Sequence, residues 1–151
     1  MANSPSQNPC GRILLVDDNC LGLAARRSVL LELGHQVLTS CTASEALELC
    51  AKQNFDVVVT DYKMPKMNGV ELIVRLRKLH PATSVILISG FTDTLGLDEA
   101  STGADVVLQK SNNEVSQLIR AVNRLLRKQQ QPPKKPTASQ AGLKTEKRKV
   151  R

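Results

Sequence analysis

The sequence predicts an α/β protein built on a doubly wound parallel sheet. Five short aliphatic runs have the length of strands, and a helical pattern follows each of them. The chain has 151 residues, enough for one domain with its own hydrophobic core. Strict alternation of strand and helix favours parallel strands that are covered by helices on both faces of the sheet.

The five aliphatic runs are bounded in several cases by glycine or by other turn residues. The predicted strands are Arg12–Asp17, His35–Ser40, Phe55–Asp61, Val85–Ser89 and Asp105–Gln109. Aromatic residues make up only 2% of the chain, so the core built by these strands is expected to be aliphatic.

The first two helices have start or stop signals in the sequence. Leu and Val recur at helical spacing over Leu21–Leu33, and Gly34 is expected just past the end of this helix. Thr42 and Glu45 have the spacing of a capping box, which predicts the start of a second helix over Ala43–Gln53.

The other three helices follow the later strands. Val70–Leu79 is amphipathic and carries basic residues near its end, where they suit the helix dipole. A short helix is predicted over Thr94–Ser101. Ser111 and Glu114 repeat the capping-box pattern and predict the start of the last helix, Asn112–Lys128.

The formal net charge of +7 is concentrated at the C-terminal end of the chain. Residues 1–126 hold 12 Lys and Arg against 13 Asp and Glu, whereas residues 127–151 hold nine basic residues and one acid. This tail is rich in Gln, Pro and Lys and has too few large apolar residues to offset its chain entropy. We therefore expect disordered segments at 1–10 and 130–151 on either side of one folded domain, residues 11–129.

Composition excludes several classes of protein. The N-terminal segment lacks the basic and apolar regions of a secretory signal, and no apolar run approaches the roughly 18 residues of a membrane span. The four cysteines form no CxxC pair and have no histidine at ligand spacing, which favours reduced thiols over a metal site. The low aromatic content argues against a surface on which nucleic-acid bases stack against aromatic rings. A soluble, cytoplasmic protein is expected.

Polar side chains stand where the predicted strands end. The first strand ends in Asp17 and Asp18, the third in Asp61, the fourth in Ser89 and the fifth in Lys110. Because all strands of a parallel sheet point the same way, these side chains are expected to gather at one edge, where doubly wound folds place their sites.

Such a cluster predicts a cation and an anion at the same place. Carboxylates packed closely cannot all stay ionised without a partner, and oxygen ligands suit a hard divalent ion such as Mg²⁺. Mg²⁺ in proteins commonly has one or two carboxylate ligands, and its other coordination positions can take water and a phosphoryl oxygen. One aspartate can then attack phosphorus to give an aspartyl-phosphate, while Lys110 and Ser89 bind the phosphoryl oxygens.

These motifs resemble the receiver domain of two-component response regulators. The matching pieces, in the family's order, are Asp17-Asp18, the segment from Asp61 to Gly69 (DYKMPKMNG), Ser89-Gly90, and Gly103-Ala104 followed by Lys110. The resemblance covers about residues 11–129 and implies a flavodoxin-like fold with strand order 2-1-3-4-5 and five helices. It is similar to the stand-alone form that chemotaxis regulators have.

The resemblance also implies a role for each site residue. Asp61 is implied to be the phosphorylated residue, and Mg²⁺ to be held by Asp17, Asp18, Asp61 and the backbone carbonyl of Lys63. Ser89 is implied to be the switch hydroxyl that binds the phosphoryl group, and Lys110 the cation that pairs with it.

Two positions depart from the family's pattern. Val107 stands where many members have the Tyr or Phe that turns inward with the switch hydroxyl. Ser111 stands where the family usually has a proline after the lysine. Signalling through this part of the surface is therefore expected to be altered, or to be carried by backbone shifts.

The sequence thus predicts a phosphoacceptor switch of a two-component system or phosphorelay, not a turnover enzyme. The implied partners are a sensor histidine kinase and a histidine phosphotransfer protein or another output protein. An alternative makes the basic tail the effector, which binds nucleic acid or an anionic surface; such binding should weaken with salt and disappear on truncation after Arg127. A haloacid-dehalogenase-like phosphatase would need a DxD motif at the first strand, which Asp17-Asp18-Asn19 does not supply.

Overall fold

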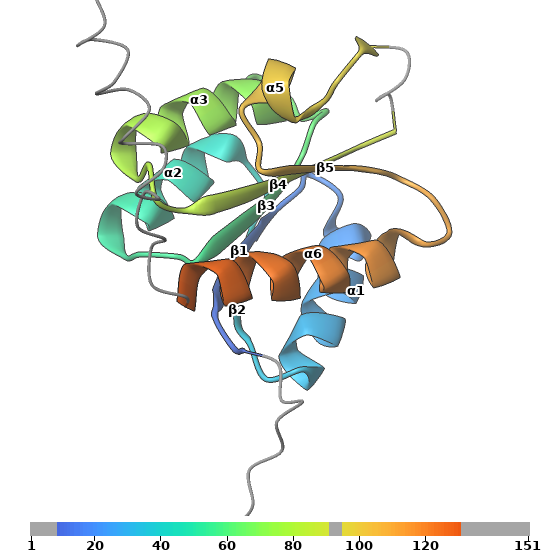
Figure 1. Ribbon diagram of the computed structural model, residues 1–151. Coiled ribbons are helices and arrows are strands. Elements are labelled where there is room, and N and C mark those ends of the chain that lie inside the picture. Colours follow the sequence, from blue (N-terminus) through green and yellow to red (C-terminus); the bar gives the residue numbers. More distant parts are fainter. Residues whose placement is uncertain (1–8, 91–94, 131–151) are drawn as a thin grey trace, which may run out of the picture.

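The computed structural model describes residues 9–90 and 95–130. Within these ranges, five parallel strands form one sheet in the order β2-β1-β3-β4-β5, with helices on both faces (Figure 1). The predicted fold class and strand order are confirmed. The segments predicted to be disordered, 1–10 and 130–151, lie outside the described residues except for positions 9, 10 and 130.

Each predicted strand is present, with ends shifted by no more than two residues. The strands are β1 Arg12–Val16, β2 Gln36–Ser40, β3 Val57–Asp61, β4 Ser84–Ser89 and β5 Val106–Gln109. In the register of the sheet, Val16 lies opposite Ser40 on one side and opposite Thr60 on the other. Because the strands are parallel and in this register, their carboxyl ends lie along one edge of the sheet.

The helices have the bounds α1 Cys20–Glu32, α2 Ala43–Lys52, α3 Gly69–Leu79, α5 Glu99–Thr102 and α6 Glu114–Gln130. The first three begin and end within one residue of the predicted positions. Side chains cap their N-termini: Asn19 accepts from two amides of α1, Thr42 accepts from the Glu45 amide, and Asn68 forms a reciprocal capping box in α3. Gly34, at φ 96°, follows the end of α1 as predicted.

Only part of the fourth predicted helix, Thr94–Ser101, is helical among the described residues. Leu95 is helical, the next three residues are not, and α5 begins at Glu99; Thr94 lies outside the described residues. Asp98 caps α5, because its carboxylate accepts from the Ser101 amide. Gly96 before it has a left-handed backbone, at φ 65°, which interrupts a helix.

The capping box predicted from Ser111 and Glu114 is wrong. The Ser111 hydroxyl accepts from the Asn113 amide, and α6 begins at Glu114 itself. The carboxylate of Glu114 accepts instead from the guanidinium of Arg26 on α1. A long-range ion pair therefore takes the side chain that the local pattern assigned to the helix cap.

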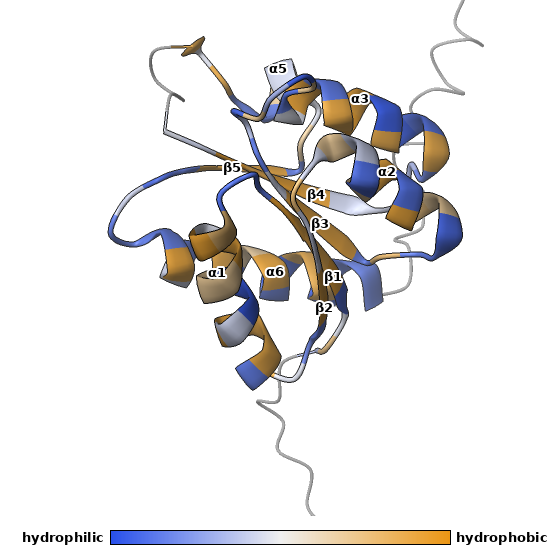
Figure 2. Cartoon of the chain, turned by 180° about the vertical axis from the view of Figure 1, so that it is seen from behind, coloured by the Kyte–Doolittle hydropathy of each residue, from blue (hydrophilic) through white to orange (hydrophobic). Residues whose placement is uncertain are grey.

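Alternate residues of the strands pack on opposite faces of the sheet. Ile13 and Leu15 join a buried cluster with α1 and α6, whereas Leu14 and Val16 join a second cluster with α2 and α3. Both clusters consist mainly of Leu, Ile, Val and Ala, so the expected aliphatic core is confirmed. Figure 2 shows hydrophobic residues along the sheet between these two helical layers.

Gly69, the first residue of α3, is held close to the end of β3. A Cβ atom at this position would lie 2.5 Å from the Asp61 carbonyl oxygen and 2.7 Å from Leu87 Cδ1. The Gly69 amide also donates to the Tyr62 carbonyl at 2.8 Å, which ties the helix start to the strand end. There is consequently no room for a side chain here.

We expect Gly69→Ala to lower the free energy of unfolding by about 1–3 kcal/mol, because the added methyl group must displace the backbone of Asp61. Urea unfolding measures this. The matched control is Gly90→Ala: a Cβ at Gly90 would meet nothing within 4 Å among the described residues, so a change within about 0.5 kcal/mol is expected. Equal losses in both variants would contradict the steric explanation.

Candidate metal centre

The carboxyl ends of four strands surround one pocket. Asp17 and Asp18 follow β1, Asp61 and Ser89 are the last residues of β3 and β4, and Lys110 follows β5. The same pocket is lined by Asp17, Asp18, Asp61, Lys63, Ser89 and Lys110. The structure thus brings together all the predicted site residues except Val107.

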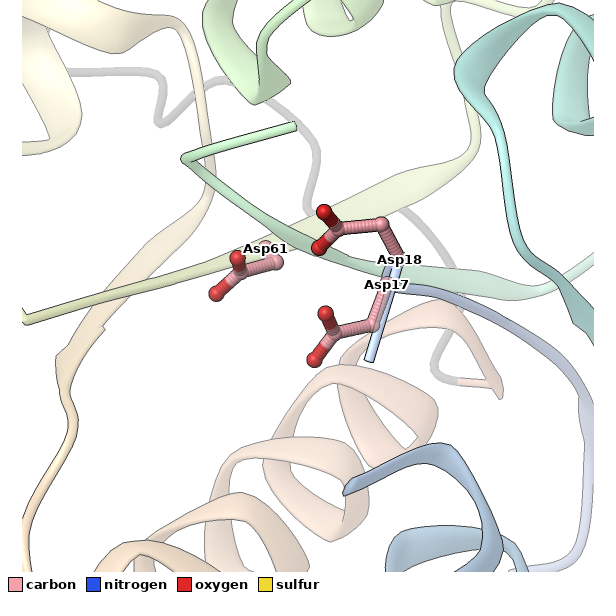
Figure 3. A group of neighbouring side chains, drawn as sticks. All are labelled: Asp17, Asp18 and Asp61. Atoms are coloured by element: carbon pink, nitrogen blue, oxygen red, sulfur yellow. The ribbon is translucent and has the colours of Figure 1, made fainter. Parts of the chain in front are cut away.

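Three aspartates converge at the centre of this pocket. One carboxylate oxygen from each of Asp17, Asp18 and Asp61 lies within 4.8 Å of the others. Figure 3 shows Asp17 and Asp18 projecting from the end of β1 to the side where Asp61 lies. Asp17 and Asp61 are buried, whereas Asp18 is exposed, so the cluster opens to solvent on the side of Asp18.

Asp61 is a buried carboxylate that forms an ion pair with Lys110. Lys110 Nζ lies 2.8 Å from Asp61 Oδ1, and among the described residues this buried oxygen has no hydrogen-bond donor besides that ammonium. Burial raises the pKa of Asp61 above its ordinary value, Lys110 opposes this shift, and the charge of Asp17 adds to it. A further cation at the pocket would therefore be favoured by Asp61.

The raised pKa of Asp61 predicts that metal-free protein loses stability as the pH rises. The folded state binds the Asp61 proton more tightly than the unfolded state. The stabilisation from this proton is complete below the unfolded-state pKa and is lost as the pH rises through the folded-state pKa. Asn resembles the neutral acid, so the stability of Asp61→Asn relative to wild type should increase over this pH range and then level off.

Urea unfolding at a series of pH values in the presence of a chelator checks this expectation. Adding Mg²⁺ at neutral pH should reduce the difference between Asp61→Asn and wild type, because the ion compensates the charge of Asp61 in the wild type alone. A difference that stays constant from acid to neutral pH would show that Asp61 titrates alike in the folded and unfolded states.

A buried arginine, which the sequence patterns did not single out, pairs with one of the pocket's aspartates. Arg26 NH1 lies 2.9 Å from Asp17 Oδ2, and its Nε lies 2.7 Å from Glu114 Oε2. Burial opposes the charge of Arg26, but hydrogen bonds and charges from Glu114 and Asp17 raise its pKa above the ordinary value. The buried residues of α1 are Leu23, Arg26 and Leu30. A charged residue at helical spacing between two buried leucines is the feature of the sequence that could have identified Arg26.

The charges and ligand atoms of the pocket fit a hard divalent cation. Three aspartates and two lysines, Lys63 and Lys110, line the pocket, which leaves one negative charge in excess. Arg26 and Glu114 beside it compensate each other in an ion pair. The converging ligands are carboxylate oxygens at strand ends, and one of them has no hydrogen-bond donor besides the Lys110 ammonium among the described residues. Mg²⁺ commonly binds one or two such carboxylates together with water and phosphoryl oxygens.

Val107 lies outside this pocket. It is partly buried in β5 and packs against the cluster formed with α2 and α3, and its amide donates to Glu99 Oε2 at 3.0 Å. The switch position is therefore linked through its backbone to α5. The roles given to Ser89, to the Lys63 carbonyl and to Val107 stay predictions.

In the part of the chain that the structure describes, no helix could cross a membrane.

Comparison with known families and proteins agrees with this geometry. The family model of the response regulator receiver domain matches residues 13–123. A gliding motility regulatory protein of Myxococcus xanthus is 33% identical over an alignment of 135 residues that covers 83% of this chain and 17% of that protein. The virulence sensor protein BvgS of Bordetella bronchiseptica is 38% identical over 93 residues, 59% of this chain and 8% of that protein. The chain thus spans less than a fifth of either relative.

Solved structures give the same result. The response regulator protein TrrA of Thermotoga maritima, in complex with Mg²⁺ and BeF, is 31% identical, with a TM-score of 0.69 over 76% of this chain and 97% of that one. The receiver domain of the Francisella response regulator 1452 is 30% identical, with a TM-score of 0.72 over 80% of this chain and 99% of that one. Sequence, fold and pocket together show that this chain belongs to the family of response regulator receiver domains of two-component signalling systems.

Proposed function

We propose that this chain is a phosphoacceptor switch in which Asp61 takes a phosphoryl group from the phosphohistidine of a sensor histidine kinase. The observation that carries the proposal is the position of Asp61, between two further carboxylates and the ammonium of Lys110 at the carboxyl edge of the sheet. A carboxylate in this place can attack phosphorus, and the charge that it acquires has cationic partners within reach.

Each side chain has a distinct part in the transfer. A carboxylate oxygen of Asp61 forms a bond to phosphorus while the bond between phosphorus and the histidine nitrogen breaks, and that electron pair returns to the imidazole. Asp17, Asp18, Asp61 and the Lys63 carbonyl would hold Mg²⁺. The ion, when bound, would neutralise charge on the phosphoryl oxygens.

Lys110 and Ser89 would stabilise the product. Lys110 pairs with Asp61 at 2.8 Å, and the same ammonium can move to a phosphoryl oxygen when the group arrives. Ser89 is buried at the end of the neighbouring strand β4 and can donate its hydroxyl hydrogen to another oxygen. Since Val107 is aliphatic, the change would reach β5 and α5 through the backbone link to Glu99 instead of an aromatic side chain.

In this proposal the phosphorylated protein is itself the signal, so the chain acts as a regulator, with self-phosphorylation from a small phosphodonor and slow autodephosphorylation, and not as a turnover enzyme. Relatives that match part of this chain include the sensor proteins BvgS and ArcB and the transcriptional regulator NtrC. The match to sensor proteins supports a histidine kinase as the donor, and a histidine phosphotransfer protein or another output protein would receive the signal.

Intact-mass spectrometry after incubation with acetyl phosphate and Mg²⁺ tests the proposal. One phosphoryl adduct is expected, and it should be absent when a chelator replaces Mg²⁺. Peptide mapping of the adduct, after its trapping as a stable derivative, should locate it at Asp61. An adduct that forms equally well with chelator, or on another residue, would contradict the proposed site.

Asp18→Asn is expected to weaken Mg²⁺ binding by about tenfold, or ~1.4 kcal/mol, because it removes the exposed carboxylate of the cluster and its charge. Isothermal titration calorimetry of the metal-free variant and of the wild type measures this. Asp56→Asn, a change at the opposite end of β3, serves as the matched control and should leave the affinity unchanged. Unchanged Mg²⁺ affinity in Asp18→Asn would remove Asp18 from the ligand set.

A further inference from the structure

Two cysteines meet beside the pocket, on the side of β1 that faces away from Asp61. Cys20 is the first residue of α1, and Cys41 follows Ser40, the last residue of β2. Their Sγ atoms lie 3.9 Å apart, although 21 positions separate them in the chain. The register of the sheet explains this contact, because Val16 and Ser40 are opposite and the segments that follow them leave the sheet side by side.

We propose that Cys20 and Cys41 form a reversible disulfide that controls the metal-binding segment after β1. A disulfide holds its sulfur atoms about 2.05 Å apart, so the two Sγ atoms must approach by about 1.9 Å from their present separation. Side-chain rotation and a small shift of the two exposed segments can supply this movement. Both thiols are exposed, so a small oxidant can reach them.

The oxidant in the proposed reaction is a peroxide. One thiolate sulfur attacks a peroxide oxygen, the O–O bond breaks, and a sulfenic acid and water result. The second thiolate then attacks the sulfenic sulfur, the S–O bond breaks, and a second water leaves as the disulfide forms. Two thiols thereby lose two protons and two electrons, which reduce one hydrogen peroxide to two water molecules. A dithiol reductant reverses the change by thiol–disulfide exchange.

The other two cysteines cannot take part in this reaction. Cys10 precedes β1, at the opposite end of the sheet, and its Sγ lies 3.8 Å from the Leu33 carbonyl oxygen. Cys50 is buried in α2, where an oxidant cannot reach its thiol. Among the described residues, only Cys20 and Cys41 therefore have a partner sulfur within reach.

The strand order gives the direction of the effect. β1 lies between β2 and β3, so a bond from Cys20 to Cys41 draws the segment after β1 toward β2. Asp18 stands two residues before Cys20 in this segment, while Asp61 is on β3. The disulfide thus moves Asp18 away from Asp61 and opens the carboxylate cluster. The formation of the bond does not depend on the proposed function, but its effect on phosphorylation rests on it.

The first experiment measures the bond itself. Full-length protein is treated with hydrogen peroxide, remaining thiols are alkylated, and the intact mass and disulfide-linked peptides are determined. One intramolecular disulfide between Cys20 and Cys41 is expected, with two thiols still alkylated after denaturation. Cys20→Ser and Cys41→Ser should each abolish it, whereas the matched control Cys10→Ser should retain it. A disulfide that includes Cys10, or none at all, would overturn the proposal.

The second experiment compares Mg²⁺ affinity and acetyl phosphate labelling in the reduced and oxidised forms. Oxidation is expected to weaken Mg²⁺ binding about tenfold, as displacement of groups that orient a metal ligand does, and to slow labelling in parallel. Reduction should restore both, and Cys41→Ser should respond to neither treatment. Equal Mg²⁺ affinities in the reduced and oxidised forms would overturn the proposal that the disulfide controls the pocket. Absence of labelling in the reduced form would instead contradict the proposed function.

Discussion

Asp61→Asn is expected to abolish the phosphoryl adduct that acetyl phosphate and Mg²⁺ give with the wild type. The amide oxygen of Asn is a weak nucleophile for phosphorus, and the substitution also removes one of the three carboxylates that would hold the ion. The buried position suits Asn sterically, and the neutral side chain avoids the cost of burying a charge. The variant should therefore fold and still carry no adduct, as intact-mass spectrometry will show.

Titration with Mg²⁺ distinguishes loss of the acceptor from loss of metal. The adduct on Asp18→Asn should recover as the Mg²⁺ concentration rises, because that variant keeps Asp61 and lacks only a ligand. Asp61→Asn should remain without adduct at every Mg²⁺ concentration. Recovery of Asp61→Asn at high Mg²⁺ would show that another residue accepts the phosphoryl group, and that Asp61 acts through the metal alone.

The sequence predicts well which residues at the strand ends line this pocket, because two regular features of the fold determine their positions. The period of the aliphatic runs locates the strands, and parallel pairing brings their carboxyl ends to one edge. Asp61 and Lys110 could thus be placed together although 49 positions separate them, and their ion pair confirms it. The capping pattern of Thr42 and Glu45 was sufficient for the start of α2, but that of Ser111 and Glu114 was not sufficient for the start of α6.

The interactions that could not be predicted from the sequence are side-chain contacts between elements that are distant in the chain. Arg26 has two partners, nine and 88 positions away, and Glu114 prefers this arginine to the local cap that its spacing suggests. The contact between Cys20 and Cys41 depends on the register of β1 against β2, which alternation of hydrophobic residues does not specify. No short motif encodes such pairs, because their members are set by packing in three dimensions.

Arg26→Met is expected to lower the free energy of unfolding by about 3–5 kcal/mol, the usual cost of removing one partner from a buried ion pair. Met fills much of the volume of the arginine stem and leaves its two carboxylate partners without the guanidinium. The side chains of Asp17 and Glu114 are only 2% and 15% exposed, so water can compensate little of this loss. Urea unfolding in the presence of a chelator measures it.

Arg27→Met is the matched control for this substitution. Arg27 is the next residue of α1 and is exposed, so the same change there should alter the free energy of unfolding by no more than about 0.5 kcal/mol. Mg²⁺ should stabilise Arg26→Met more than it stabilises the wild type, because the ion then supplies the only strong compensation for Asp17. If Arg26 served only to fill space, Met would be tolerated and the Mg²⁺-dependent gain would be the same in both proteins. A large loss together with the larger gain identifies Arg26 as the cation that keeps the carboxylate cluster folded before metal binds.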